Sequence, residues 1–249
     1  MRAAHAGNIG WMTDLSPPQE YNDPLIAEVV VRKTERAARD MASHPPPASD
    51  SATLLMAILA AREGADAACI LDIGGAAGIH CFVFRRAFPH VPVRWAVVET
   101  PAMVERARTL EGDGLRFFTS VEAARTWLGK LDVINCSGSI QYMPEPEHTL
   151  EQLLGLRARY VAISRLPLLK VDRETRIETS RLADNGPGPL PPGLVDIEVH
   201  YPVTIMSRES FLGILSVDYR LLATTDAKPS GFEKDGRAIL QYSYLFSRN

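Results

Sequence analysis

The sequence has few cysteines and no long apolar run, and each absence excludes a class of protein. Only three cysteines occur among 249 residues, at Cys69, Cys81 and Cys136, all in stretches expected to be core. They do not form the framework of a disulfide-rich secreted domain, so we expect buried thiols of a reducing cytoplasm. No stretch approaches the ~20 apolar residues of a membrane helix, and the N-terminus lacks the continuous apolar core of a signal peptide. We therefore expect a cytoplasmic protein with no membrane partner.

An excess of positive charge is also absent. The chain has 27 Lys and Arg against 30 Asp and Glu, a formal net charge of −3, and no basic run. This balance predicts no nucleic-acid partner. The 6 His are scattered, with no pair at ligand spacing on one helix, so we expect no metal site. No Gly-x-Ser-x-Gly elbow occurs, and Ser137-Gly138-Ser139 is interpreted as a short turn.

What is present favours one α/β domain with a helical appendage, given the length and the 46% apolar content. From residue 68 to residue 164, short apolar runs alternate with helical patterns, which predicts right-handed crossovers and a parallel sheet. The expected strands are 68–73, 93–98, 115–118, 131–136 and 160–164. The expected helices between them are 76–87, 100–110, 121–128 and 147–156.

Two helices are expected before the first strand. Asp23-Pro24 is a capping signal for a helix that runs to about Ala42, and Asp50 or Ser51 caps a second. Residues 1–67 are therefore predicted to form an N-terminal helical cap, and residues 68–249 the sheet domain. The cap has two interpretations, which are extra packing on the sheet or a lid over the active site, with Trp11 and Tyr21 pointing in.

The alternation ends after residue 164. The inserted region 165–203 combines a charged piece of helical character with a loop at 186–193, and it is the other candidate wall of the site, with Tyr201. A helix capped by Ser207 and two strands, 217–224 and 238–247, close the chain. The fold class expected is therefore a Rossmann-like α/β fold. Its seven-stranded, mostly parallel sheet carries an antiparallel C-terminal strand pair.

The stretch Cys69–Thr100 carries the strongest functional signal. Its first apolar run ends in Asp72 and its second in Glu99, and a glycine cluster follows the first, at Gly74, Gly75 and Gly78. Carboxyl ends of parallel strands form the ligand crevice, glycines allow close approach of backbone, and a carboxylate there can hold ribose hydroxyls. This pattern indicates a nucleoside-containing cofactor. The competing interpretations are a plain strand-to-helix turn and a solvated charge at a helix start.

Here the sequence resembles a family. The stretches LDIGGAAGIH and LDVINCSGSIQYMPEP, the acidic Glu99 and the terminal strand pair resemble class I S-adenosylmethionine-dependent methyltransferases, over about residues 68–249. The stretch GWMTDLSPPQEYNDPLI is similar to the start of a little-characterised group of methyltransferase-like proteins associated with bacterial polysaccharide and secondary-metabolite genes. The family pattern Asp-x-Gly-x-Gly-x-Gly is altered here, because Ala76 replaces the middle glycine and Gly75 is added beside it.

The resemblance implies S-adenosylmethionine (SAM) as cofactor. The turn would pass under its methionine portion, Glu99 would take the ribose hydroxyls, Phe118 would flank the adenine, and the end of strand 131–136 would face the sulfonium. The cofactor-binding residues expected are Asp72, Gly74, Gly75, Gly78, Glu99, Thr100, Phe118, Asn135, Cys136, Ser137 and Gln141. The candidate catalytic bases are Tyr21, His80 and Tyr142, and the ring of Tyr142 suits a sulfonium cation.

Nicotinamide binding is the main competitor and has little support. No Gly-x-Gly-x-x-Gly occurs, and His80 stands where the looser match Gly74–Ile79 requires glycine next. The resemblance therefore implies methyl transfer from SAM to a secondary-metabolite or sugar-type small molecule, free or bound to a carrier protein. Two alternatives stay open. One is a SAM-consuming cyclase that gives azetidine-2-carboxylate and methylthioadenosine, and the other is a non-catalytic SAM- or S-adenosylhomocysteine-binding protein.

Overall fold

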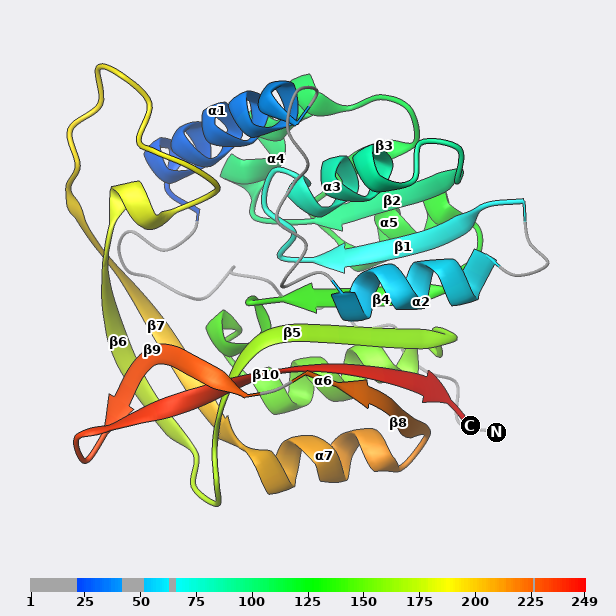
Figure 1. Cartoon of the computed structure of the whole chain (residues 1–249), viewed down its shortest axis with the longest axis vertical. Helices are drawn as coiled ribbons and strands as arrows, with labels where there is room; N and C mark the ends of the chain where they lie inside the picture. Colours follow the sequence, from blue (N-terminus) through cyan, green and yellow to red (C-terminus); the bar gives the residue numbers. More distant parts are fainter. Residues whose placement is uncertain (1–21, 42–51, 63–65, 226) are drawn as a thin grey trace.

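The described part of the chain folds around one mixed sheet of ten strands (Figure 1). The computed structural model describes residues 22–41, 52–62, 66–225 and 227–249. The predictions made for Trp11, Tyr21, Asp50 and Ser51 lie outside these residues. The core of the sheet has, in spatial order, β3 (Leu115–Phe118), β2 (Val93–Val98), β1 (Ala68–Ile73), β4 (Val133–Ser137), β5 (Tyr160–Leu169), β10 (Arg237–Arg248) and β8 (Tyr219–Thr224).

Five neighbouring strands of this core are parallel and contain the strands expected from the apolar runs. Paired residues include Ile70 with Trp95 and with Val133, which fixes β1 between β2 and β4. The bounds are β1 Ala68–Ile73, β2 Val93–Val98, β3 Leu115–Phe118, β4 Val133–Ser137 and β5 Tyr160–Leu169.

The antiparallel end of the sheet confirms the expected fold class. β10 (Arg237–Arg248) lies antiparallel between β5 and β8 (Tyr219–Thr224). Three more strands bring the sheet from seven to ten. β6 (Glu174–Arg181) and β7 (Glu198–Ser207) form a hairpin, and β9 (Lys228–Lys234) pairs with β10.

The helical character expected within 165–203 is therefore wrong. Residues 174–181 form β6, in which half-buried and exposed residues alternate along the strand. Such alternation is typical of a strand in a sheet with one face covered. It is not visible in the sequence here, because charged residues occur on both faces of the strand. β7 joins the main sheet where Leu168 and Leu169 of β5 pair in parallel with Met206 and Ser207.

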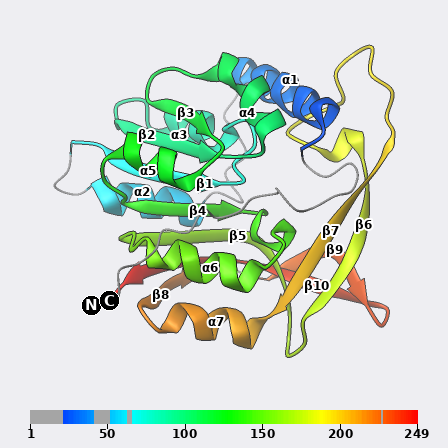
Figure 2. The ribbon, with the colours of Figure 1, turned by 180° about the vertical axis from the view of Figure 1, so that it is seen from behind.

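Helices cover both faces of the sheet, which gives three layers (Figure 2). One face carries α2 (Ala52–Arg62), α3 (Ile79–Ala87) and α4 (Pro101–Ala107), and α1 (Pro24–Asp40) packs against α3 and α4. The other face carries α5 (Val121–Leu128), α6 (Pro146–Gly155) and α7 (Arg208–Ser216). Short 3₁₀ turns follow several elements, at η1 (Arg108–Leu110), η2 (Ile140–Tyr142) and η3 (Leu182–Asp184).

Side-chain caps start the helices where the sequence predicts. The Asp23 carboxylate accepts a hydrogen bond from the Leu25 amide at 2.7 Å, and Thr100 Oγ1 accepts one from the Met103 amide at 3.3 Å. Each satisfies an amide that the helix itself leaves unpaired. Helix α3 is the exception, because it begins at Ile79 rather than at residue 76. The preceding turn holds Gly78 at φ +77° as its left-handed N-cap.

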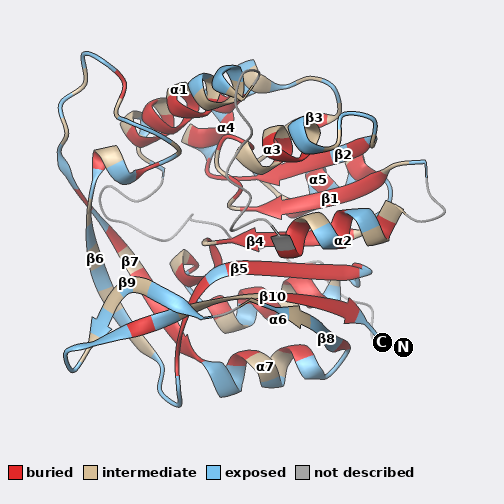
Figure 3. Ribbon diagram, in the orientation of Figure 1, coloured by how far each residue is buried: buried red, intermediate tan, exposed pale blue. Residues whose placement is uncertain are grey.

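The buried residues lie along the central strands and the inward faces of the helices (Figure 3). β1 is buried at every position, as a strand covered by helices on both faces must be. The three cysteines are free and buried, as expected. No helix in the described parts of the chain is long and apolar enough to cross a membrane.

A buried lysine joins α1 to the β6–β7 insertion. The side chain of Lys33 lies on the inward face of α1, and its Nζ donates to the carbonyl oxygens of Ala183 and Asn185, both at 2.7 Å. Burial lowers the pKa of Lys33, and the nearby carboxylates of Asp184 and Asp196 oppose that shift. Gly186 packs beside this contact, since a Cβ there would lie 3.2 Å from the Val30 Cα. The two candidate walls of the site are thus fastened together.

We expect Lys33→Met to lower the free energy of unfolding by about 1–2 kcal/mol, because two buried carbonyls lose their donor while an apolar chain of similar length remains. Urea denaturation measures this change. Arg36→Met on the exposed side of the same helix is the control, with an expected change below about 0.5 kcal/mol. Equal stability of the two variants would show that the lysine contact contributes nothing.

Candidate functional site

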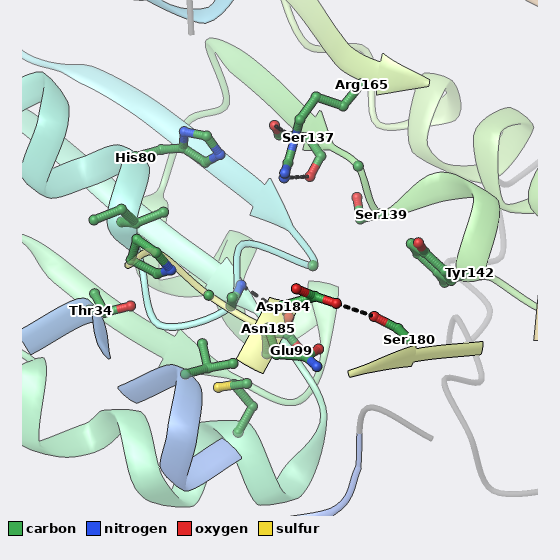
Figure 4. Close-up of a pocket in the computed structure, with 18 of the residues that line it drawn as sticks. Thr34, His80, Glu99, Ser137, Ser139, Tyr142, Arg165, Ser180, Asp184 and Asn185 are labelled. Atoms are coloured by element: carbon green, nitrogen blue, oxygen red, sulfur yellow. Dashed lines mark hydrogen bonds between the residues drawn. The ribbon is translucent and has the colours of Figure 1, made fainter. Parts of the chain in front are cut away.

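The described residues surround a cavity of about 890 Å³ at the carboxyl ends of β1, β4 and β5 (Figure 4). Its walls come from the turn after β1, the residues after β2 and β4, one side of α1, and the two hairpins of the insertion and the C-terminus. This is the edge at which parallel α/β sheets bind ligands. The cavity therefore lies where the sequence places the site.

The turn after β1 forms the floor of the cavity and has no room for side chains. Gly74 has φ +63°, and a Cβ there would lie 2.5 Å from the Ser139 Cβ. A Cβ on Gly75 would lie 2.6 Å from the Asp72 Cγ. Ala76, which replaces the family glycine, also adopts a left-handed φ of +50°. The backbone of the turn is thus exposed to the cavity at Gly74, and the alanine keeps the conformation that glycine would have there.

Asp72 supports this turn from below rather than reaching the cavity. It is fully buried, and its two carboxylate oxygens accept hydrogen bonds from the Asn135 amide group at 2.7 Å and the Trp95 indole at 2.9 Å. Burial raises the pKa of Asp72, while His80, Arg165 and the two hydrogen bonds oppose the shift. Neither Asp72 nor Asn135 lines the cavity. Both were expected to bind the cofactor, and the structure makes them the support of the turn.

Glu99 lies in the cavity wall and is held by backbone amides. Its Oε1 accepts from the Ala76 amide at 3.0 Å and its Oε2 from the Thr100 amide at 2.8 Å. Burial raises the pKa of Glu99 to about 7, against the effect of these two hydrogen bonds, and the charge of Asp72 adds to the increase. Each carboxylate oxygen keeps a free lone pair. The carboxylate is therefore placed to accept hydrogen bonds from a ligand at the tip of the turn.

A ligand that donates hydrogen bonds to Glu99 should bind more weakly in acid. Such a ligand selects the carboxylate, and Glu99 with a pKa of about 7 becomes protonated as the pH falls from 8 to 6. We expect the affinity for S-adenosylhomocysteine to fall about tenfold over this range. Calorimetry at the two pH values measures it, and Glu99→Gln should remove the difference. An unchanged affinity would mean that the ligand does not use this carboxylate.

The end of β4 contributes Ser137 but not Cys136 to the cavity. Cys136 points to the opposite face of the sheet and packs with Leu71 and Ile134. Burial raises the pKa of its thiol. Adjacent residues of a strand face opposite sides, so the expectation that all three residues from Asn135 to Ser137 face one ligand conflicts with the strand geometry.

Arg165 also belongs to this wall of the cavity, although it was not among the site residues expected from the sequence. It follows the buried part of β5 with φ +53°, and its guanidinium donates to the Ser137 carbonyl at 2.8 Å and to Ser137 Oγ at 3.3 Å. Gly138 makes room for the guanidinium, because a Cβ there would lie 3.0 Å from an Arg165 nitrogen. Its position directly after a predicted strand end was the available signal.

The turn η2 after β4 brings Gln141 and Tyr142 to the cavity. Gln141 is buried and its amide donates to the Arg165 carbonyl at 3.5 Å, while its Oε1 has no hydrogen-bond partner among the described residues. The Tyr142 hydroxyl donates to Glu178 of β6 at 2.7 Å. Both residues were expected after this strand, whereas Glu178 was not identified from the sequence.

The other expected residues are divided between the cavity and its surroundings. His80 and Thr100 line the cavity, and Thr100 is also the cap of α4. Gly78 caps α3 and packs on Leu115 and Phe117. Phe118 lies outside the lining, with its ring 5.8 Å from that of Trp127. Among the described residues, no group of three or more His, Cys, Asp or Glu could hold a metal ion.

The fold and the position of the cavity define a class. The chain has the Rossmann-like α/β fold of SAM-dependent methyltransferases, with a parallel half, an antiparallel C-terminal end and the cavity at the switch between them. No family model matches the sequence, and no curated protein matches it.

Among solved structures, the sugar N-methyltransferase KedS8 from Streptoalloteichus sp. is similar to this chain, with a TM-score of 0.50, 16% sequence identity, and coverage of 96% of this chain and 100% of that one. The CcbJ methyltransferase from Streptomyces caelestis gives a TM-score of 0.49 and 12% identity, over 91% of this chain and 99% of its own. The amino pentose methyltransferase CalS10 from Micromonospora echinaspora gives 0.48 and 17%, over 86% and 96%.

Proposed function

We propose that this chain is a SAM-dependent methyltransferase that acts on a small molecule of secondary-metabolite or sugar type, in the cytoplasm. The observation that carries the proposal is the Glu99 carboxylate, held by two backbone amides beside a side-chain-free glycine turn in the wall of a large cavity. A pair of ribose hydroxyls is the ligand feature that suits such a carboxylate. The similarity of fold to KedS8, a sugar N-methyltransferase, supports the same class.

The residues present fit an adenosyl ligand. Gly74 and Gly75 leave the turn free of side chains, which close passage of a ligand over backbone requires. The unpartnered oxygen of the buried Gln141 side chain suits a donor or the positive charge of a sulfonium. The residues that would hold SAM are therefore the turn at Gly74, Glu99, Ser137, Ser139 and Gln141.

Bound SAM supplies a methyl group on a positively charged sulfur. The contribution of this chain is then to position the acceptor in line with that methyl group and to keep water away. Val30, Thr34 and Ala37 of α1 form one wall of the cavity, and the hairpins form the opposite wall. Pockets for small molecules span about 300–1,000 Å³, so 890 Å³ leaves room for an acceptor beside the nucleoside.

The test is to incubate the purified chain with SAM, with and without a pool of small metabolites, and to identify the products by mass spectrometry. Methyl transfer predicts S-adenosylhomocysteine and a product 14 mass units heavier, only with the pool. Azetidine-2-carboxylate and methylthioadenosine from SAM alone would identify a cyclase instead. Binding without turnover would identify a non-catalytic binding protein, and no binding in calorimetry would reject the proposal. Adding acyl-carrier proteins loaded with amino acids tests a carrier-bound acceptor.

A further inference from the structure

One end of the cavity is built by the two hairpins and the turn η2. None of the residues expected to bind the cofactor lies there, and Tyr142, a candidate catalytic base, does. We call this part the hairpin end. It is lined by Tyr142, Glu178, Ser180, Tyr201, Phe232 and Gln241. Five of these six side chains come from β6, β7, β9 and β10, the strands of the two hairpins. The hairpin end is therefore formed almost entirely by these hairpins.

Two carboxylates lie near the hairpin end. Asp184 accepts hydrogen bonds from Ser180 Oγ at 3.5 Å and from the Arg181 amide at 3.2 Å, whereas no cation among the described residues forms an ion pair with Glu178. It lies on the inward face of β6 and is half-buried. Its Oε2 accepts the Tyr142 hydroxyl at 2.7 Å, and burial raises its pKa while that hydrogen bond lowers it. Glu174, on the same face of the same strand, is paired with both Arg176 and Lys234. The charge of Glu178 is thus left for a ligand.

Aromatic rings surround this carboxylate. Tyr142 and Tyr201 meet edge to face, with ring centroids 6.2 Å apart and planes at 75°, and Phe232 lines the same part of the cavity. The negative faces of aromatic rings attract ammonium groups, and the attraction increases where water is excluded. A partly buried carboxylate beside aromatic rings therefore favours a cationic ligand over a neutral or anionic one.

We propose that the hairpin end is the acceptor subsite and that the acceptor is an amine, which arrives protonated and is held by Glu178. This inference rests on the function proposed above. About four lone-pair positions exist on a carboxylate and Tyr142 occupies one, which leaves positions for the N–H groups of an ammonium. Before the amine can accept a methyl group, one N–H bond breaks and the proton forms an O–H bond with the Glu178 carboxylate. The nitrogen lone pair is then free to attack.

The test uses three probes of one shape and different charge, which are benzylamine, benzyl alcohol and benzoate, titrated by calorimetry into the full chain with S-adenosylhomocysteine present. We expect benzylamine to bind most tightly and benzoate least. Glu178→Gln keeps an oxygen to accept the Tyr142 hydroxyl but removes the charge, and it should weaken benzylamine binding tenfold or more and leave benzyl alcohol within twofold. The matched control Glu174→Gln should change neither.

Preference for benzoate, or equal affinity of wild type and Glu178→Gln for benzylamine, would overturn the amine subsite. If Glu178→Gln fails to fold, the order of the three probes on the wild-type chain decides. The titration with S-adenosylhomocysteine alone separates the two proposals. If that ligand does not bind but benzylamine still depends on Glu178, the proposed function and the acceptor role fail, and the hairpin end is an amine-binding site only. If it binds and benzylamine shows no dependence, the subsite fails alone.

Discussion

Gly74→Ala is expected to lower the free energy of unfolding by about 3 kcal/mol and to abolish S-adenosylhomocysteine binding. The added methyl group would lie 2.5 Å from the Ser139 Cβ, and Gly74 has φ +63°. A left-handed backbone costs a non-glycine residue about 1–2 kcal/mol, and overpacking adds about 1–3 kcal/mol. Relief of the overlap requires the turn to move, and the turn forms the floor of the cavity. Thermal denaturation and calorimetry measure the two effects.

A control substitution at a second glycine separates the energetic cost of the backbone conformation from the cost of steric overlap. Gly129 has φ +75°, follows α5, and a Cβ there would meet nothing within 4 Å. Gly129→Ala should therefore lose stability through its backbone conformation alone, by at least about 1–2 kcal/mol, and leave ligand affinity unchanged. If Gly74→Ala and Gly129→Ala lose the same stability and both bind the ligand normally, the close packing of the turn has no functional consequence.

Glu99→Ala is expected to weaken S-adenosylhomocysteine binding by about 1.5–3 kcal/mol, which is roughly 10- to 150-fold. The buried carboxylate offers its remaining lone pairs to the cavity, and its removal leaves the ligand hydroxyls without a charged acceptor. Calorimetry near pH 8, where Glu99 is ionised, gives the full effect. Glu105→Ala, on the exposed side of α4, should bind as the wild type does.

The ligand provides an independent check of the same contact. S-adenosylhomocysteine without its 2′-hydroxyl should bind the wild-type chain more weakly, and Glu99→Ala should not distinguish the two ligands. This comparison is a double-mutant cycle between one side chain and one ligand group. Equal discrimination by the wild type and the variant would place the ribose elsewhere in the cavity.

Most of the fold could be predicted from the sequence, because the signals are local. The runs at 68–73, 93–98 and 115–118 are strands with the expected bounds. Asp23 caps α1 and Thr100 caps α4, as their sequence signals predicted. The hairpin β6–β7 could not be predicted in this way. Its first strand alternates between half-buried and fully exposed residues and has no apolar run, so its identity depends on pairing with β7, which is distant in sequence.

The site was predicted in part. Glu99, Gly74, Ser137, Gln141, His80 and Tyr142 line one cavity. Cys136 was expected beside Ser137 but does not line the cavity, because adjacent residues of a strand face opposite sides of the sheet. Glu178 could not be predicted as a site residue, because a carboxylate in a charged stretch is normally expected to face solvent. Only the pairing of β6 with β7 places its side chain at the cavity. The role of Lys33 also depends on a partner 150 residues away.

The manner in which β6 and β7 are attached makes the proposed acceptor subsite separable from the rest of the molecule. The hairpin is inserted after β5, pairs with itself along eight positions, and is paired with β5 of the main sheet at two positions, beside a small apolar cluster shared with β5 and β10. The parallel strands, the glycine turn and Glu99 do not depend on that pairing. If the proposed function holds, exchange of this segment, together with the helix that carries its anchoring lysine, changes the acceptor and leaves the proposed nucleoside site as it is.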